Sequence, residues 1–381
     1  MSAATTPVIV EARRTPLGKE DGAFADVRSE DLSIALVNEI LAETALSGEE
    51  VDDLMWGCAQ QRGEQDNNVA RVIALLSELG EGVPATTINR WCASSMQAVA
   101  SASDAIRAGS REVVIAGGVE SMSRVPMGEG HGHLHPGLAD AYNVGELMMG
   151  MTAEKVAEKF GVSRADQDAF ALRSHERAAE ATESGRFADE IVPVETEEGT
   201  VDRDEGIRYD TSMEALGSLP TVFKGDGTVT PGNASQITDG AAATLVTSEA
   251  FADEHGLEVL ASVGNNAVAG VDPTIMGIGP VPATEALLRK TGGEIDEYDL
   301  VEINEAFASQ CEYSRRELGI EKDRLNVNGG AIAIGHPLGA SGARLPVTLI
   351  HELRKRGGGR GLATLCVGFG QGMAIEFDVN R

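Results

Sequence analysis

Aromatic side chains and long apolar runs are both scarce in this chain of 381 residues. Aromatics make up 4% of the residues whereas glycine occurs 45 times, which is typical of an interior of small side chains with close backbone packing. No stretch approaches the run of about 20 apolar residues that a membrane-spanning helix needs, and residues 1–18 lack an apolar signal-peptide segment. The sequence therefore predicts a globular α/β protein in the cytoplasm, with no membrane partner.

Cysteine is also scarce, and its spacing excludes two classes of protein. The four cysteines, at positions 58, 92, 311 and 366, form no C-x-x-C pair, so neither a zinc cage nor a disulfide framework is predicted. The segment HGHLHPG carries His131, His133 and His135, but no carboxylate or cysteine stands nearby at ligand spacing. We therefore expect a solvated loop there, no metal, and free thiols in a reducing compartment.

Positive charge is the third deficiency. The formal net charge is -29, and only seven of the 31 basic residues are lysine. Such a chain is a poor partner for nucleic acid. A carboxylate-rich surface indicates a halophilic protein that works in concentrated salt, where a Debye length of roughly 3 Å at 1 M removes most self-repulsion. The alternative is an acidic enzyme from an ordinary environment.

The length exceeds the usual size of a single core, so several units are expected. Short apolar runs alternate with helical patterns at both ends of the chain, which predicts two similar halves with mostly parallel sheets covered by helices. We divide the chain into an N-terminal half (1–119), an inserted loop domain (120–237), a return to the first half (238–256) and a C-terminal half (257–381). In the insertion, Ser163 and Asp166 predict a capping box, and Gly185 predicts the helix end.

Cys92 is a candidate nucleophile. It follows an apolar strand at 85–89 and precedes a run of helix formers, so its sulfur is expected near the positive end of a helix. That position lowers the pKa of a thiol. The alternative is a small, inert, buried cysteine.

Two further segments carry groups able to move protons. His336 stands between Gly335 and Pro337 in a glycine-rich loop, where it is either a proton acceptor or a packed loop histidine. Cys366 ends an apolar run, and the glycines that follow leave backbone N–H groups free for an oxyanion hole. These glycines are no dinucleotide fingerprint, because the next residues read as a strand. Asn304 lies between a strand and a helix, where it either caps the helix or orients a water molecule.

Taken together, these segments resemble the thiolase family, specifically the NEAFA-type acetyl-CoA acyltransferases. The resemblance spans essentially the whole chain and depends on several motifs in the family's order and spacing. These are INRWCASSMQA, MGMTAEKVA, GNASQITDGAAA, MGIGPVPA, VEINEAFA, NVNGGAIAIGHPLGASGAR and CVGFGQG.

The resemblance implies a thiolase fold, in which two βαβαβ-type halves form a five-layered α/β/α/β/α core with an inserted lid domain. It implies that Cys92 is the acyl-accepting nucleophile, His336 its activator and Cys366 the general acid and base. It also implies two oxyanion sites, one from His336 and a water held by Asn304, and one from the N–H groups of Cys92 and Gly368. Coenzyme A is then a substrate, no cofactor is bound permanently, and a homodimer or homotetramer is expected. The implied CoA and pocket contacts are Arg208, Ser235, Met149, Met276 and Phe307.

Three residues depart from the family pattern next to expected substrate contacts. Ser95 and Gln236 stand where glycine is usual, and Thr238 replaces the common asparagine. Ser95 is expected to narrow the pocket or disturb the turn into the helix. Two alternatives remain open: a 3-ketoacyl synthase-like condensing enzyme, against which Cys366 argues, and a non-catalytic acyl-CoA-binding subunit of a larger complex. The direction of the reaction and the acyl-chain length are left undetermined.

Overall fold

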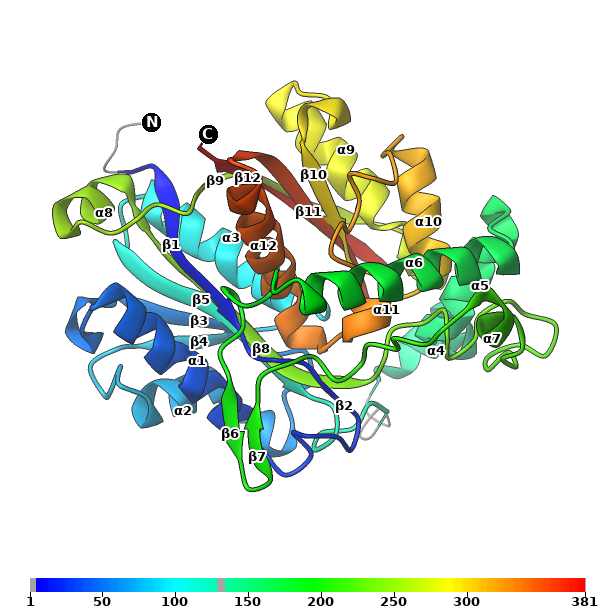
Figure 1. The fold of residues 1–381 in the computed structure, drawn as a ribbon, viewed down its shortest axis with the longest axis horizontal. Coiled ribbons are helices and arrows are strands. Elements are labelled where there is room, and N and C mark those ends of the chain that lie inside the picture. The colour runs from blue at the N-terminus through cyan, green and yellow to red at the C-terminus, as the bar shows by residue number, and fades with distance from the viewer. Residues whose placement is uncertain (1–4, 129–133, 381) are drawn as a thin grey trace.

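The apolar runs of the sequence form ten strands of one sheet in the computed structural model, which describes residues 5–128 and 134–380 (Figure 1). A separate two-stranded ribbon consists of β6 (Val194–Thr196) and β7 (Gly199–Val201). The strands of the large sheet are β1 (Pro7–Arg14), β2 (Gly18–Lys19), β3 (Asp53–Gly57), β4 (Ala85–Ile88), β5 (Val113–Ser121), β8 (Thr238–Ser248), β9 (Ala261–Gly270), β10 (Leu300–Ile303), β11 (Gly359–Val367) and β12 (Gln371–Val379).

The strand order is β10-β11-β12-β9-β1-β8-β5-β3-β4, with β2 paired to β8. Strands β1 and β9 join the two parts of the sheet through only two residue pairs, Val8 with Ser262 and Ile9 with Ala261. The prediction of a mostly parallel sheet is wrong: in the described residues, only β3–β4, β3–β5 and β10–β11 are parallel. The reason is that β8 returns from the insertion antiparallel between β1 and β5, and that β11 and β12 form a hairpin.

The N-terminal strands and the C-terminal strands each carry helices on their outer face, and two further helices lie between the two sets of strands. Helices α1 (Ser29–Thr44) and α2 (Val69–Leu76) pack on the N-terminal strands, and α9 (Pro280–Thr291) packs on the C-terminal strands. Between the two sets of strands lie α3 (Ser94–Arg107) and α12 (Leu338–Lys355), which contact each other and strands from both halves (Figure 1). This arrangement gives the five layers, α/β/α/β/α, that the resemblance implies.

The two central helices approach each other closely because small residues line their contact. A Cβ atom on Gly342 would lie 2.4 Å from the backbone nitrogen of Met96, and one on Gly118 of β5 would lie 2.3 Å from the carbonyl oxygen of Gly339. Any larger side chain at these positions would force the elements apart. The low aromatic content of the sequence therefore has a structural reason.

The segment between β5 and β8 leaves the sheet and covers the C-terminal half. Helix α6 begins with the predicted capping box of Ser163 and Asp166, and the chain turns at Gly185 (φ 73°), so this prediction is confirmed. Helix α6 packs along α11, and α5 packs against α10. The remaining helices are α4 (Pro136–Ala141), α5 (Met149–Phe160), α6 (Arg164–Glu183), α7 (Met213–Gly217), α8 (Glu249–His255), α10 (Ala308–Glu317) and α11 (Ala331–Ile334).

A fully buried arginine links this segment to the sheet through ion pairs. Arg14, at the end of β1, donates to Glu190 Oε1 (2.6 Å) and to both carboxylate oxygens of Asp204 (2.7 and 3.0 Å). Thr348 of α12 also donates to Glu190 (3.0 Å). The cluster therefore joins three parts of the chain through charges that are hidden from water, where an unpaired charge is costly.

We expect Arg14→Met to lower the free energy of unfolding by about 3–5 kcal/mol, because it leaves two buried carboxylates without their cation. Urea unfolding in molar KCl measures the loss. The control is Arg289→Met, whose pair with Glu285 (3.8 Å) lies more than half exposed and is expected to contribute less than about 1 kcal/mol. Equal losses in the two variants would contradict this role of Arg14.

Candidate active site

Cys92 lies in a tight turn between β4 and α3. The turn is held by a hydrogen bond from Trp91 N to Asn89 Oδ1 (2.8 Å), and Trp91 adopts a left-handed backbone with φ 44°. Helix α3 begins two residues later, at Ser94, so the strand-to-helix position predicted for Cys92 is confirmed. The side chain is buried, with 2% exposure.

The predicted lowering of the Cys92 pKa is wrong for the free protein. Burial raises the pKa of the Cys92 thiol to about 12, and the N–H groups of Gly368 and of Cys92 itself oppose the increase only in part. Removal of water penalises the thiolate more than the helix terminus and these donors stabilise it. Cys92 is therefore a thiol at neutral pH until a base takes its proton.

His336 lies where α11 gives way to α12. Its backbone N–H donates to Thr238 Oγ1 (3.1 Å), and its Nδ1 lies 2.6 Å from Ser341 Oγ. Because Ser341 donates its own hydroxyl hydrogen to the Pro337 carbonyl (2.8 Å), its oxygen is left to accept from Nδ1–H. This tautomer leaves Nε2 as the basic nitrogen.

The His336 ring is neutral over a wide pH range. Burial, together with the smaller effect of the nearby Arg344 guanidinium, lowers the pKa of His336 to about 3. Asn304 Nδ2 lies 3.3 Å from Nδ1 and 3.2 Å from Nε2, so the amide sits between the two nitrogens rather than along the lone pair of either. The ring is thus uncharged, with its hydrogen on Nδ1 and none on Nε2.

Beside His336, the side-chain oxygen of Asn304 is a hydrogen-bond acceptor without a protein donor in the described residues. The residue follows β10, and it does not cap α10, whose N-cap is Phe307. Its Oδ1 is buried and has no hydrogen-bond partner within residues 5–128 and 134–380. Buried polar atoms without a protein partner commonly bind an ordered water.

Cys366 is the last but one residue of β11. It is 1% exposed and lies in a small apolar cluster that also contains Met276, Phe307 and the partly buried Met149. Burial raises the pKa of the Cys366 thiol well above its ordinary range, and a charge on Cys92 raises it further. Gly368, two residues after Cys366, packs on Trp91, the residue before Cys92, so the two cysteines lie in the same part of the core. The structure brings three of the predicted pocket residues to the second cysteine.

The two predicted CoA contacts differ in their surroundings. Ser235 donates its N–H to the Ala306 carbonyl (3.0 Å), next to Phe307, so it lies beside the apolar cluster. Arg208 is exposed, and only its backbone N–H is engaged, donating to Nδ1 of the buried His175 (3.1 Å). Its guanidinium is thus open to solvent at the surface of the segment between β5 and β8.

The three departures from the family pattern have structural roles. Ser95 does not disturb the turn: its side chain faces α12, where its Oγ accepts from Ala343 N (2.8 Å). Gln236 Nε2 donates to the carbonyl of Gly206 (2.9 Å) and to carbonyls of α11. Thr238 Oγ1 accepts a hydrogen bond from the backbone N–H of His336. Gln236 therefore links the inserted segment to the helix that precedes the catalytic loop.

Sequence reasoning missed Glu120, the last but one residue of β5. Its buried carboxylate accepts from Gly339 N (2.8 Å) at the start of α12, from Ala59 N (2.9 Å) and from Gln65 Nε2 (2.7 Å). A carboxylate at a helix N-terminus fixes that end of the helix, here directly after His336. The available signal was an acidic residue inside the otherwise apolar run VVIAGGVES.

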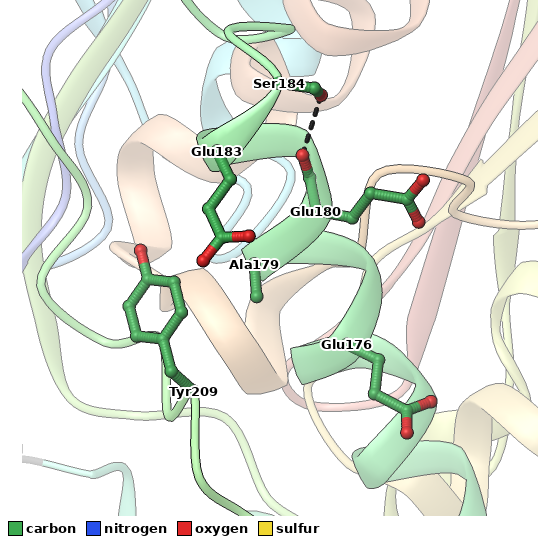
Figure 2. A pocket seen from close by; sticks show the side chains of 6 residues that line it. All are labelled: Glu176, Ala179, Glu180, Glu183, Ser184 and Tyr209. Carbon is green, nitrogen blue, oxygen red and sulfur yellow. Dashed lines mark hydrogen bonds between the residues drawn. The ribbon is translucent and has the colours of Figure 1, made fainter.

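A surface hollow on α6 is lined by none of the cysteines and not by His336 (Figure 2). It is lined by Glu176, Ala179, Glu180, Glu183, Ser184 and Tyr209. Its three carboxylates would repel an anionic ligand, and it contains no thiol or histidine. The reactive groups therefore lie elsewhere, inside the core.

The described part of the chain contains no cluster of three or more side chains suited to hold a metal ion, and no helix there is long and apolar enough to cross a membrane. His131 and His133 lie outside the described residues. His135 accepts from Gly137 N (3.1 Å) at the start of α4.

Comparisons with known proteins agree with this geometry. The chain is 46% identical to the beta-ketoadipyl-CoA thiolase of Pseudomonas putida, covering 97% of this chain and 98% of the relative. It is 46% identical to the 3-ketoacyl-CoA thiolase of Bacillus subtilis, covering 98% and 99%. Crystal structures of the Bacillus anthracis acetyl-CoA acetyltransferase and of human mitochondrial 3-ketoacyl-CoA thiolase superpose with a TM-score of 0.91 each, at 40% and 39% identity. The first covers 99% of this chain and 100% of the other, and the second covers 100% of both.

The family assignment covers both halves. Residues 7–250 match the thiolase N-terminal domain, and residues 257–379 match the thiolase C-terminal domain. The buried thiols, the neutral imidazole and the fold therefore lead to one conclusion: the chain belongs to the thiolase family.

Proposed function

We propose that the protein is an acetyl-CoA acyltransferase that cleaves 3-ketoacyl-CoA with CoA and also runs the reverse Claisen condensation. The observation that carries the proposal is the approach of the two cysteine segments from opposite halves of the chain: Gly368, two residues after Cys366, packs on Trp91, the residue before Cys92, and its N–H is directed at the Cys92 sulfur. A single thiol suffices to accept an acyl group. A second one is needed because breaking or forming the carbon-carbon bond moves a proton on carbon.

In the first half-reaction, His336 Nε2 takes the proton of Cys92, and the thiolate attacks the keto carbon of the substrate. The N–H groups of Cys92 and Gly368 stabilise the tetrahedral oxyanion. Collapse breaks the carbon-carbon bond, leaves an acyl group on Cys92 and releases the enolate of acetyl-CoA. His336, now protonated at Nε2, and a water held by Asn304 donate to the enolate oxygen, and Cys366 protonates its carbon.

In the second half-reaction, the Cys366 thiolate takes the proton of CoA. The CoA thiolate then attacks the acyl group, and the expelled Cys92 thiolate recovers its proton from His336. The order of events follows from charge, because a thiolate on Cys92 disfavours a thiolate on Cys366. Acylation of Cys92 removes its negative charge before Cys366 becomes a thiolate.

The remaining contacts follow from the surroundings of Cys366. We propose that Met149, Met276 and Phe307 line the acyl and pantetheine end of the channel and that Ser235 contacts the pantetheine chain. The exposed Arg208 guanidinium supplies positive charge for CoA phosphate on a protein of net charge -29. Residues 120–237 would then serve as the CoA-binding insertion between residues 1–119 and 238–256, with residues 257–381 as the second half.

We also propose a homodimer or homotetramer in the cytoplasm. Strand β4 ends the sheet, so its outer edge offers backbone groups to a second copy, and the neighbouring helix α2 exposes Leu75 and Leu76. The four cysteines are free, as expected in a reducing compartment.

Replacement of the two cysteines tests the two half-reactions separately. With acetoacetyl-CoA and CoA, Cys92→Ala and Cys366→Ala are each expected to reduce turnover by at least about 10³-fold. Incubated with acetyl-CoA alone, Cys366→Ala is expected to gain the mass of one acetyl group on Cys92, whereas Cys92→Ala gains none. Loss of turnover with no acetylation of Cys366→Ala would contradict the separate roles. Lack of wild-type turnover with short and long 3-ketoacyl-CoA would favour the non-catalytic subunit.

The pH dependence of Cys92 alkylation tests its protonation state. With a pKa of about 12, the thiolate fraction rises about tenfold per pH unit between pH 7 and 10, so labelling by iodoacetamide should rise without levelling. The Cys366→Ala variant, followed by peptide mass spectrometry, restricts the readout to the remaining thiols. A plateau above pH 6 would instead indicate a resting thiolate–imidazolium pair.

Salt dependence tests the halophilic expectation. If self-repulsion of the surface carboxylates is screened in the cell, lowering KCl from about 2 M to 0.1 M should lower Tm by several degrees, since the Debye length grows from a few ångströms to about 10 Å. Differential scanning calorimetry at both salt concentrations measures the shift. An unchanged Tm would support an acidic enzyme of an ordinary environment.

A further inference from the structure

Two aromatic residues beside the active-site cysteines have an unusual backbone. Trp91 precedes Cys92, Phe369 follows Gly368, and both lie in the left-handed region, with φ values of 44° and 60°. Bulky side chains rarely adopt this conformation, which glycine adopts freely. Among the described non-glycine residues with positive φ, these are the only two aromatic ones.

The two rings contact each other across the halves of the chain. Their centroids lie 5.5 Å apart, with the planes tilted by 46°. A Cβ atom on Gly368 would lie 3.4 Å from Cγ of Trp91, so the indole packs directly on the Gly368 backbone. A second tie between the same turns is the hydrogen bond from Arg90 Nη1 to Gln371 Oε1 (3.1 Å).

Packing alone does not explain an aromatic residue at position 369. Its side chain is 39% exposed, so little apolar area is gained by burial. The three-residue turn between β11 and β12 needs positive φ at Phe369 and Gly370, which a second glycine would satisfy without strain. Backbone strain that brings no gain in packing is typical of functional sites.

We propose that Trp91 and Phe369 are positioning residues that form an aromatic brace. The brace fixes the N–H of Gly368, from the C-terminal half, relative to the sulfur and N–H of Cys92, from the N-terminal half. It rests on the proposed function, in which these two N–H groups stabilise the tetrahedral oxyanion. The orientation of the Cys92 N–H depends on ψ of Trp91, so release of Trp91 from its turn would rotate that donor away.

Phe369→Gly distinguishes an effect on catalysis from an effect on stability. The substitution removes the ring, but glycine adopts the left-handed turn without strain. Loss of a whole oxyanion donor costs about 10²–10³ in kcat, so misplacement of one is expected to lower kcat by at least about tenfold. KM for CoA should change by less than about twofold, since the proposed CoA contacts lie elsewhere, and Tm should stay equal or rise. Phe369→Tyr, which keeps the ring, should restore kcat.

The matched control is Ala45→Gly at the C-terminal cap of α1, another left-handed non-glycine residue (φ 55°) outside the site. It should keep or raise Tm without changing kcat. Trp91→Ala combined with Phe369→Gly should be no slower than the slower single variant, because the two rings act as a unit.

The outcomes distinguish the brace from the proposed function. Wild-type kcat in Phe369→Gly, beside an inactive Cys92→Ala, overturns the brace and leaves the thiolase mechanism standing. A fall in Tm that parallels the fall in kcat also overturns it, since the ring would then act only in stability. Turnover by Cys92→Ala would overturn the proposed function itself.

Discussion

The close contact of α3 and α12 in the middle of the molecule is the constraint on which the active site depends. Both helices lie between the two sets of strands, and glycine at positions such as Gly342 lets their backbones approach. Cys92 lies just before the N-terminus of α3, and His336 lies just before the N-terminus of α12. The packing that builds the core therefore also brings Cys92 and His336, the proposed nucleophile and base, into one region.

Burial decides how these groups ionise. The thiols and the imidazole lie away from water, so each is held in its neutral form: burial raises the pKa values of both cysteines and lowers that of His336. Neutral thiols and a neutral imidazole leave this part of the core without charge separation in the free protein. Charge then appears only as protons move during the reaction, where fixed N–H donors stabilise it.

The supporting carboxylates hold the loops that carry this chemistry. Glu120 accepts from the first turn of α12, and Glu305 accepts from Ser174 Oγ (2.6 Å) and Ile332 N (3.1 Å), which fastens α6 and α11. Arg14 joins Glu190 and Asp204 in the same way near β1. On a strongly acidic chain, these buried acids differ from the surface ones because each has several donors.

The sequence by itself determined the reactive groups, their order and much of the local structure. The strand before Cys92, the capping box of α6 and the strand after Gly370 are all local, because periodicity, caps and turn residues act over a few positions. The motifs also identified the family. Only the tertiary structure decided that β8 runs antiparallel between β1 and β5, that Asn304 does not cap α10, and that the Cys92 thiol is not acidified. It also revealed the contact of Trp91 with Phe369. Desolvation and contacts between distant segments arise from the packed fold as a whole, so no short stretch of sequence encodes them.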